Sequence, residues 1–432
     1  MKYLKINPSS LCGKIKIPPS KSMSHRAVIC AGLSEEKSVI DDIIFSQDII
    51  ATCEAMKALG ISIDIVEKNL QDYKKIYIEG RKKLKLINNS IDCKESGSTL
   101  RFLIPIALLT GDKITFKGSG KLVERPLNVY YEIFDKQGIE YSNHNGNLPL
   151  EVKGSLSHGE YKVKGNISSQ FISGLLFTLP LLKGDSKIII TTELESKAYI
   201  DLTLQMLKTF NIEIENNNYE EFYIKGNQKY ISKDYKVEGD FSQAAFWLVG
   251  GIIGEKISCC NLEMDSLQGD KVILDIIKKM GGNIKIKEDF VEVSKSQTKG
   301  IVIDASQCPD LVPILAVLGS VSDGTTKIIN AERLRIKECD RLKAITNELK
   351  ILGANIEELE DGLVIQGRKT LNGGVVDSWN DHRIAMALAV ASIKCTESVI
   401  IKGSNAVSKS YPQFWNDFKK LGGNIHECCV GK

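Results

Sequence analysis

Two patterns of apolar and polar residues recur along the chain. In the first, a short helix-like run breaks at a small or polar residue and is followed by a segment in which apolar and polar residues alternate, as in LQMLKTFNIEIEN and IIKKMGGNIKIK. The alternation indicates a strand with one buried face. Because glycine, and next to it asparagine, tolerates the left-handed backbone conformation best, we expect a helix to end at each break. The six breaks are Gly60, Gly138, Asn211, Gly281, Gly353 and Gly422.

The spacing of these breaks indicates an internal repeat. Successive breaks are 78, 73, 70, 72 and 69 residues apart, and one sixth of the 432-residue chain is 72 residues. A nearly constant period is the signature of a repeated structural unit. A chain of this length is also too long for one ordinary core. We therefore expect six copies of one unit, divided three and three between two similar domains.

Each unit also contains an earlier helix that is apolar on nearly every side, so the unit reads strand, helix, strand, helix, strand. These helices are expected to be buried, and they begin near Ser24, Gly97, Ser169, Ser242, Asp310 and His382. The polar residues of their first turns allow two interpretations. They could be ordinary N-caps, with Ser24 capping the first helix. Alternatively, the partial positive charges of several converging helix starts could form an anion pocket in a cleft between the two domains.

Overall charge and hydropathy exclude several classes of partner. The 57 Lys and Arg residues nearly balance the 54 Asp and Glu residues, which gives a formal charge of +3, and aromatic residues make up only 7% of the chain. No global field or basic aromatic stripe therefore attracts nucleic acid. The longest apolar run, residues 102–109, is too short to span a bilayer, and the first residues hold no signal-peptide core. We expect a cytoplasmic protein that binds neither nucleic acid nor membranes.

Neither cysteine nor histidine spacing predicts a metal centre or a cofactor. The eleven cysteines include no C-x-x-C pair, and the five histidines show no H-x-x-x-H or H-E-x-x-H spacing. We expect the cysteines to be reduced and mostly buried, the adjacent Cys428 and Cys429 among them. No metal and no cofactor are expected.

Cationic residues cluster near the predicted helix starts and in short polar segments. Taken singly, each could be an ordinary solvated charge. Together they favour a site for a polyanion, because Arg binds phosphate or carboxylate oxygens in pairs and Lys supplies a point charge. Asp310 and Glu338 are the carboxylates among them and hence the candidate general acid and base, although Asp310 could instead be an N-cap. The cations are Lys21, Arg26, Arg101, Arg125, Lys337, Arg341, Arg383 and Lys409.

At these residues the chain closely resembles the 5-enolpyruvylshikimate-3-phosphate synthase family. Nine segments carry the resemblance in order along the whole chain: PPSKSMSHRA, ESGSTLRF, VERPL, SSQFISGLL, ESKAYIDLTL, PDLVPILAVL, RIKECDRL, WNDHRIAMA and SKSYPQFW. The resemblance implies an α/β fold of six βαβαββ units, three in each of two domains, with buried helices and an interdomain cleft. It also implies a monomer, with one domain at residues 19–234 and the other at residues 1–18 and 235–432.

The resemblance further implies an activity. In this family the enolpyruvyl group of phosphoenolpyruvate is transferred to the 5-hydroxyl of shikimate 3-phosphate, and phosphate is released by addition and elimination, on the pathway to chorismate and the aromatic amino acids. Shikimate 3-phosphate would be bound by Lys21, Ser22, Arg26, Ser168, Ser169, Gln170, Ser196, Tyr199, Asp310 and Lys337. Phosphoenolpyruvate would be bound by Lys21, Gly97, Arg125, Gln170, Arg341, Arg383 and Lys409. Asp310, Glu338 and Lys21 would carry the proton transfers. Arg333 stands where relatives have an Asn that contacts the substrate, and it is not assigned a role.

Two alternatives compete with this interpretation. The related enolpyruvyl transferase that acts on UDP-N-acetylglucosamine commonly uses a loop cysteine near the KGSGKLVERPL region, but this chain has no cysteine between Cys93 and Cys259. A non-catalytic polyanion-binding protein with two hinged domains is the second alternative. The carboxylates Asp310 and Glu338 argue against it, because they would weaken a purely anion-binding site.

Overall fold

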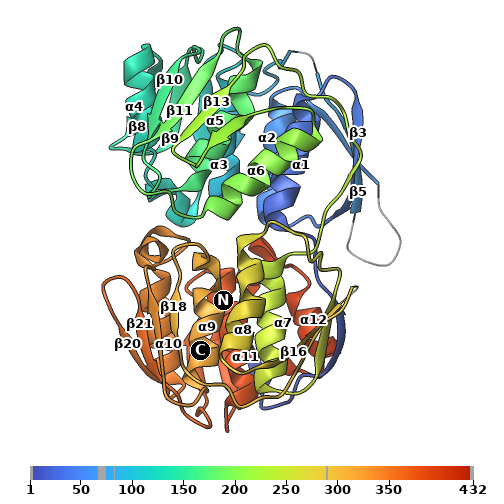
Figure 1. The fold of residues 1–432 in the computed structure, drawn as a ribbon, viewed down its shortest axis with the longest axis vertical. Helices are drawn as coiled ribbons and strands as arrows, with labels where there is room; N and C mark the ends of the chain where they lie inside the picture. The colour runs from blue at the N-terminus through green and yellow to red at the C-terminus, as the bar shows by residue number, and fades with distance from the viewer. Residues whose placement is uncertain (1–2, 67–73, 82, 289, 429–432) are drawn as a thin grey trace. The chain divides into compact units, whose positions relative to one another are not determined.

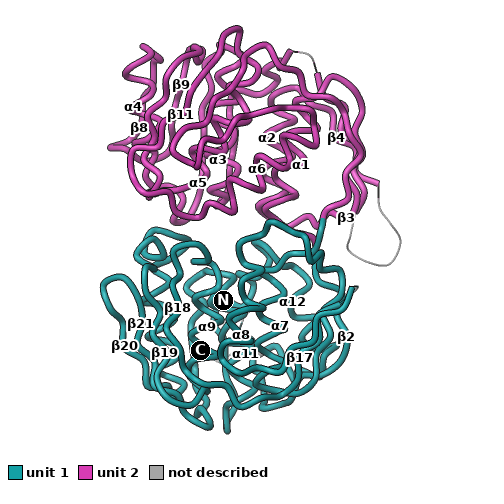
Figure 2. The backbone as a smooth tube through the Cα atoms, viewed as in Figure 1, with its two compact units in different colours: residues 1–18, 238–432 teal, residues 19–237 magenta. Residues whose placement is uncertain are grey.

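The protein divides into two compact units. The structure, a computed structural model, describes residues 3–66, 74–81, 83–288 and 290–428. One unit consists of residues 1–18 and 238–432, and the other of residues 19–237 (Figure 2). The chain thus passes from one unit to the other after Pro18 and again after Val237.

The two units contain six four-stranded sheets with one shared topology in the described part of the chain. In the sheet β6 (Ser90–Asp92), β7 (Ile114–Lys117), β9 (Asn147–Lys153), β8 (Glu140–His144), the first pair is parallel and the other two pairs are antiparallel. The other five sheets repeat this order of parallel and antiparallel pairs. Six equivalent sheets confirm the sixfold repeat and the βαβαββ unit.

Two further sheets belong to the unit of residues 19–237 and three to the other unit. The former are β14 (Tyr235–Lys236), β3 (Lys37–Ile43), β5 (Lys74–Glu79), β4 (Ser62–Val66), and β10 (Glu160–Val163), β11 (Ser186–Ile190), β13 (Glu221–Ile224), β12 (Glu215–Asn217). The latter are β2 (Gly13–Lys16), β15 (Ile257–Cys260), β17 (Phe290–Ser294), β16 (Asn283–Ile286); β18 (Val302–Asp304), β19 (Thr325–Ile329), β21 (Leu363–Gln366), β20 (Asn355–Glu358); and β22 (Gly374–Asp377), β23 (Val399–Lys402), β1 (Tyr3–Asn7), β24 (Asn424–Cys428).

Strands from distant parts of the chain complete three of these sheets. β2 pairs with β15 and β14 pairs with β3, so each strand that precedes a crossing belongs to the unit that the chain then leaves. β1 lies between β23 and β24, which joins the start of the described chain to its end. The repeat is therefore regular in space although its strands are not consecutive in sequence.

One set of helices is largely buried in each unit, and its members are labelled in Figure 1. It comprises α1 (Lys21–Leu33), α3 (Gly97–Ala107) and α5 (Ser169–Thr178), and α7 (Phe241–Ile253), α9 (Val312–Ser320) and α11 (His382–Ala391). Every residue of α7, α9 and α11 is buried, as their apolar sequences predict. The second set is α2 (Gln47–Ala58), α4 (Asn128–Gln137), α6 (Lys197–Thr209), α8 (Ile273–Lys279), α10 (Arg341–Ile351) and α12 (Phe414–Lys420).

The predicted helix breaks are confirmed by the backbone. All six have positive φ: Gly60 91°, Gly138 66°, Asn211 65°, Gly281 87°, Gly353 84° and Gly422 104°. Glycine adopts positive φ without steric cost and Asn tolerates it better than most residues, which explains why these two residue types occupy the breaks.

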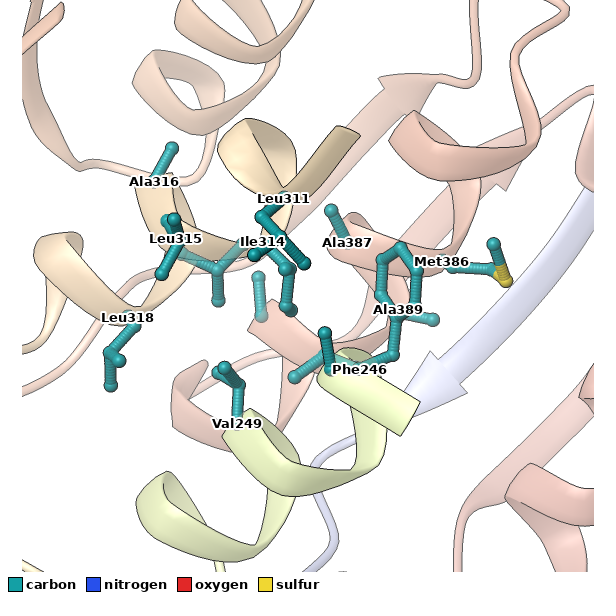
Figure 3. Packing of buried hydrophobic residues seen from close by; sticks show 14 of the residues in the cluster. Phe246, Val249, Leu311, Ile314, Leu315, Ala316, Leu318, Met386, Ala387 and Ala389 are labelled. Carbon is teal, nitrogen blue, oxygen red and sulfur yellow. The ribbon is translucent and has the colours of Figure 1, made fainter. Parts of the chain in front are cut away.

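Apolar side chains from three buried helices form the core of the unit of residues 1–18 and 238–432. Phe246 and Val249 of α7 gather with Ile314 of α9 and Ala387 of α11 (Figure 3). Full burial of a side chain such as Phe or Ile stabilises a fold by about 1.5–3 kcal/mol. In α7 and α11 the polar side chains, Ser242, Gln243, His382 and Arg383, all lie in the first turn.

The cysteines whose side chains are described are free thiols. Seven of them are buried, Cys260 is partly buried and Cys12 is exposed. Cys429 lies outside the described residues. Within the described ranges, no helix combines the length and hydropathy that a bilayer crossing requires.

Candidate active site

In the unit of residues 19–237, the candidate site residues lie mostly at helix starts. The first N–H groups of a helix lack partners within the helix, so a helix start attracts acceptors and negative charge. Ser20, Ser96 and Ser168 cap α1, α3 and α5, and each Oγ accepts a hydrogen bond from a backbone N–H of the first turn. The expectation that Ser24 caps α1 is wrong. The helix begins three residues earlier, and Ser24 Oγ donates to the Ser20 carbonyl (2.8 Å).

Two guanidinium groups lie beside the glycine that begins α3. A β-carbon built on Gly97 would lie 2.9 Å from Arg125 Nη1 and 3.0 Å from Arg101 Nη1. Gln170 belongs to the same group, because its Oε1 accepts from Arg101 Nη1 (2.8 Å) and its Nε2 donates to Ser98 Oγ (2.9 Å). The structure therefore brings together Gly97, Arg125 and Gln170, three of the residues assigned to phosphoenolpyruvate. Arg101, which was not assigned to a substrate, belongs to the same group.

Lys21 and Arg26, both on α1, have different surroundings. Lys21 Nζ lies 2.7 Å from Asp48 Oδ2, and its side chain is partly exposed. Arg26 is buried, with Nε donating to Thr203 Oγ1 (2.9 Å) and Nη2 donating to the Tyr199 carbonyl (2.7 Å). Burial lowers the pKa of Arg26 to about 10, so the guanidinium stays charged at neutral pH. Arg26 thus ties α1 to α6, whereas Lys21 stays accessible.

The remaining candidates of this unit surround Arg26 and the start of α5. The Ser22 carbonyl accepts from Arg26 Nη1 (2.8 Å). Ser196 is the buried residue before α6 and has a φ of 55°. Ser169, the first residue of α5, is also buried, while the side chains of Ser168 and Tyr199 are partly exposed.

In the other unit, Asp310 is the centre of a cluster of charged side chains. It lies within a 3₁₀ turn, Pro309–Leu311, immediately before α9. Its Oδ1 lies 2.9 Å from Arg341 Nη1 and 3.8 Å from Lys337 Nζ, and its Oδ2 lies 3.0 Å from Arg383 Nη2. The carboxylate is therefore engaged by three cations, and the alternative that Asp310 is an N-cap is not what the structure shows.

Arg341, the first residue of α10, contacts three carboxylates. Besides Asp310, its Nη2 lies 2.6 Å from Glu338 Oε2 and its Nε lies 2.7 Å from Asp381 Oδ2. Asp381 also caps α11, because its Oδ1 accepts from the backbone N–H of Arg383 (2.8 Å). Burial of these groups is acceptable because every charge has a partner of opposite sign within hydrogen-bond distance.

The environment shifts the pKa values of two members of this cluster in ways that matter for proton transfer. Burial alone would raise the pKa of Asp310, but Arg383, Lys337 and Arg341 outweigh it and hold that pKa well below its usual range. Burial lowers the pKa of Lys337 to about 8, with help from Arg333 and against the attraction of Asp310. Asp310 is therefore ionised at neutral pH, while Lys337 can exchange a proton close to neutral pH.

Lys409 is held near the start of α11. Its Nζ donates to the carbonyl of Asn380 (2.6 Å), two residues before the helix begins, and its side chain is largely buried. The structure thus gathers Asp310, Lys337, Glu338, Arg341 and Arg383 into one cluster. It places Lys409 near the start of α11, the helix that carries Arg383.

Sequence reasoning missed the carboxylates that pair with the cations. Asp48 and Asp381 compensate Lys21 and Arg341, so the surplus of positive charge is smaller than the cations alone indicate. Asp381 directly precedes His382 and Arg383 in the segment WNDHR, and its position as a cap was a usable signal. Asp48 has no such local signal, because its partner is 27 residues away.

Comparison with known proteins shows full-length relatives. A model of the EPSP synthase (3-phosphoshikimate 1-carboxyvinyltransferase) family matches residues 6–418. The 3-phosphoshikimate 1-carboxyvinyltransferase of Clostridium novyi is 64% identical over 438 residues, with 100% of both chains covered. The protein of the same name from Clostridium kluyveri is 58% identical, and that from Clostridioides difficile is 56% identical, again with 100% of both chains covered.

Solved structures agree on the fold. A structure of the EPSP synthase of Acinetobacter baumannii matches with a TM-score of 0.83 at 24% identity, covering 99% of this chain and 100% of that chain. A second structure of EPSP synthase from Acinetobacter baumannii gives a TM-score of 0.81 at 23% identity. At this identity the match supports the architecture of the chain.

Proposed function

Because the chain belongs to the EPSP synthase family, we propose that it transfers the enolpyruvyl group of phosphoenolpyruvate to the 5-hydroxyl of shikimate 3-phosphate and releases phosphate. The family assignment rests on a match over residues 6–418 and on full-length relatives such as the one from Clostridium novyi, which is 64% identical. The protein is thus a transferase of the shikimate pathway, which leads to chorismate and the aromatic amino acids.

One structural observation supports the chemistry most strongly. Asp310, Lys337, Glu338 and Arg341 form one connected cluster in which a carboxylate that is ionised at neutral pH lies beside a lysine with a pKa of about 8. Addition requires a proton at the phosphoenolpyruvate methylene and removal of a proton from the ring hydroxyl, and elimination reverses the first of these transfers. We propose that Asp310, Glu338 and Lys21 carry these transfers.

We propose that cationic side chains bind the anionic groups of the substrates. Each phosphate carries about −1.5 to −2 charges at neutral pH, and each carboxylate adds one more. We propose that phosphoenolpyruvate is bound by Lys21, Gly97, Arg125, Gln170, Arg341, Arg383 and Lys409. We propose that shikimate 3-phosphate is bound by Lys21, Ser22, Arg26, Ser168, Ser169, Gln170, Ser196, Tyr199, Asp310 and Lys337.

In this arrangement Gly97 would have a specific purpose. Two arginine side chains approach its α-carbon so closely that a β-carbon would lie at 2.9–3.0 Å from their Nη1 atoms. The first N–H groups of α3 and both guanidiniums could then bind the same anion, because no side chain intervenes. This supports the assignment of phosphoenolpyruvate to this helix start.

We further propose that the protein works as a cytoplasmic monomer with two domains, and that the boundary predicted after residue 234 lies after Val237, because Tyr235 and Lys236 pair with β3. Both substrates are small, charged metabolites, and neither requires a membrane or a macromolecular partner. Sedimentation equilibrium of the purified chain would test the monomer, since a dimer doubles the mass.

Incubation of the purified protein with both substrates in deuterium oxide tests the proposed reaction. Protonation of the methylene makes a methyl group that then loses one hydrogen, so the product should carry deuterium in its vinyl group. Mass spectrometry should detect this product with shikimate 3-phosphate and none with UDP-N-acetylglucosamine. A product formed only with UDP-N-acetylglucosamine would reassign the enzyme, and no product with either acceptor would overturn the proposal.

A further inference from the structure

A buried carboxylate outside the proposed substrate-binding set is linked to it by one hydroxyl group. Asp270 lies in a 3₁₀ turn, Gly269–Val272, and is 5% exposed. Its Oδ2 accepts a hydrogen bond from Ser242 Oγ, in the first turn of α7. Serine has a single O–H donor, so this bond directs the hydroxyl hydrogen toward Asp270 and leaves the Oγ lone pairs for another donor.

That other donor is Arg383. Its Nη2 lies 3.0 Å from Ser242 Oγ and 3.0 Å from Asp310 Oδ2, and its Nη1 donates to the Asp310 carbonyl (3.2 Å). The two hydrogens of Nη2 are thus directed at two acceptors, which fixes the plane of the guanidinium. Only one of these acceptors belongs to the proposed substrate-binding residues. The other, Ser242, is oriented by Asp270.

The segment that carries Asp270 is anchored to the start of α7 by a second residue. Gln268 Oε1 accepts from Phe241 N (3.0 Å), one of the N–H groups that has no partner within the helix. Gln268 Nε2 donates to Glu238 Oε1 (2.8 Å) and to the Gly239 carbonyl (2.7 Å). Asp270 and Ser242 are therefore held in a fixed relation by contacts on both sides of the helix start.

We propose that Asp270 is a positioning residue which, through Ser242 Oγ, holds Arg383 in the orientation that receives phosphoenolpyruvate. This inference rests on the proposed function, which assigns Arg383 to that substrate. Asp270 itself is enclosed and would not touch the substrate. Because Arg383 is assigned to phosphoenolpyruvate, loss of the contact through Ser242 should weaken the binding of phosphoenolpyruvate more than that of shikimate 3-phosphate.

The charge of Asp270 gives this contact a pH dependence. Burial, then the charge of Asp310, raises the pKa of Asp270 to about 7, against the attraction of Arg383. Asp270 Oδ1 is buried and has no hydrogen-bond partner among the described residues, which also disfavours the ionised form. The titratable or charged groups facing it are Asp240 at the start of α7, Cys308 and Asp310 before α9, and Arg383 on α11. From α8, Asp275 is exposed.

Ionisation of Asp270 places a second negative charge near Arg383. Asp310 supplies the first, at 3.0 Å from Arg383 Nη2. An ionised Asp270 therefore weakens the attraction of Arg383 for an incoming anion, and protonation removes this effect. The Michaelis constant (KM) for phosphoenolpyruvate should rise as the pH increases through about 7.

Steady-state kinetics of four chains between pH 5.5 and 8.5 test the inference: the wild type, Asp270→Asn, Ser242→Ala and the control Asp275→Asn. Ser242→Ala should raise the KM for phosphoenolpyruvate about tenfold and that for shikimate 3-phosphate less than about threefold, because it releases one of the two contacts of Arg383 Nη2. Asp270→Asn keeps an acceptor for Ser242 but no charge. Its KM for phosphoenolpyruvate should fall below that of the wild type at pH 8.5 and lose the rise near pH 7, while Asp275→Asn matches the wild type.

Phosphoenolpyruvate also titrates in this range, but its contribution is common to all four chains. Equal pH profiles for the wild type and Asp270→Asn, together with an unchanged KM in Ser242→Ala, would overturn the inference alone. If Ser242→Ala weakens both substrates equally and lowers the melting temperature, the residue is structural and the inference is likewise wrong. Absence of turnover in the wild type would overturn the proposed function and this inference with it.

Discussion

Arg341 and Asp381 form an ion pair that is closed off from solvent. Arg341 Nε lies 2.7 Å from Asp381 Oδ2, and the two side chains are 2% and 0% exposed. The same carboxylate caps α11 by accepting from the backbone N–H of Arg383 (2.8 Å). Asp381 therefore fixes one arginine of the proposed phosphoenolpyruvate site through its side chain and a second through the helix that carries it.

Replacement of Asp381 by Ala should destabilise the unit of residues 1–18 and 238–432. Removing one partner of a buried ion pair leaves a charge uncompensated and costs about 3–5 kcal/mol. Urea unfolding followed by circular dichroism would measure the loss. The exposed Asp275→Ala should change the free energy of unfolding by less than about 0.5 kcal/mol. A loss in Asp381→Ala as small as in this control would show that the pair is not needed.

Replacement of Gly97 by Ala should weaken phosphoenolpyruvate selectively. The new β-carbon would lie 2.9 Å from Arg125 Nη1 and 3.0 Å from Arg101 Nη1, so both guanidiniums must move. We expect the KM for phosphoenolpyruvate to rise about tenfold, equivalent to ~1.4 kcal/mol. The melting temperature should change little, because the displaced atoms are the ends of flexible side chains.

Gly250→Ala is the matched control for this change. Gly250 lies within α7, and a β-carbon there would have no neighbour closer than 3.7 Å. It should leave the KM for phosphoenolpyruvate unchanged. If Gly97→Ala behaves in the same way, Gly97 is not placed beside this substrate.

Asp270 should make the protein less stable as the pH rises toward neutral. Its folded pKa, about 7, lies above the unfolded value of about 3.9, so the folded state binds the proton more tightly. The resulting stabilisation is complete below about pH 4 and is lost as the pH rises to about 7. Asp270→Asn should therefore gain stability relative to the wild type between pH 5 and pH 8. Melting temperatures of both chains at pH 5 and at pH 8 measure this gain. A difference between Asp270→Asn and the wild type that is the same at both pH values, or smaller at pH 8, would refute the buried-charge assignment.

Much of the fold could be predicted from sequence because its determinants are local. Gly138 and Asn211 each indicate a residue with left-handed backbone conformation, because few other residue types adopt that conformation. Continuous apolar runs such as that of α7 likewise report full burial. The strands that complete sheets across the chain, β2 and β14, were harder to place, because pairing over more than 190 residues leaves no local pattern.

Only part of the candidate site could be predicted from sequence. Its cations form clusters in the sequence, but the carboxylates that pair with them depend on packing between helices and loops. The contacts of Lys21 with Asp48 and of Ser242 with Asp270 join residues 27 and 28 positions apart, and no spacing rule predicts them. The choice between Ser20 and Ser24 as the cap of α1 likewise depended on where the helix begins, which sequence fixes only to within a turn.

Phosphate release from shikimate 3-phosphate and phosphoenolpyruvate, measured on the wild type, Asp310→Asn and Glu338→Gln, tests the central claim most directly. We predict turnover by the wild type and a loss of at least about 100-fold in kcat for each variant, because each loses a proposed proton-transfer group. The circular dichroism of all three chains should agree. Binding of both substrates by the wild type without release of phosphate would contradict the account.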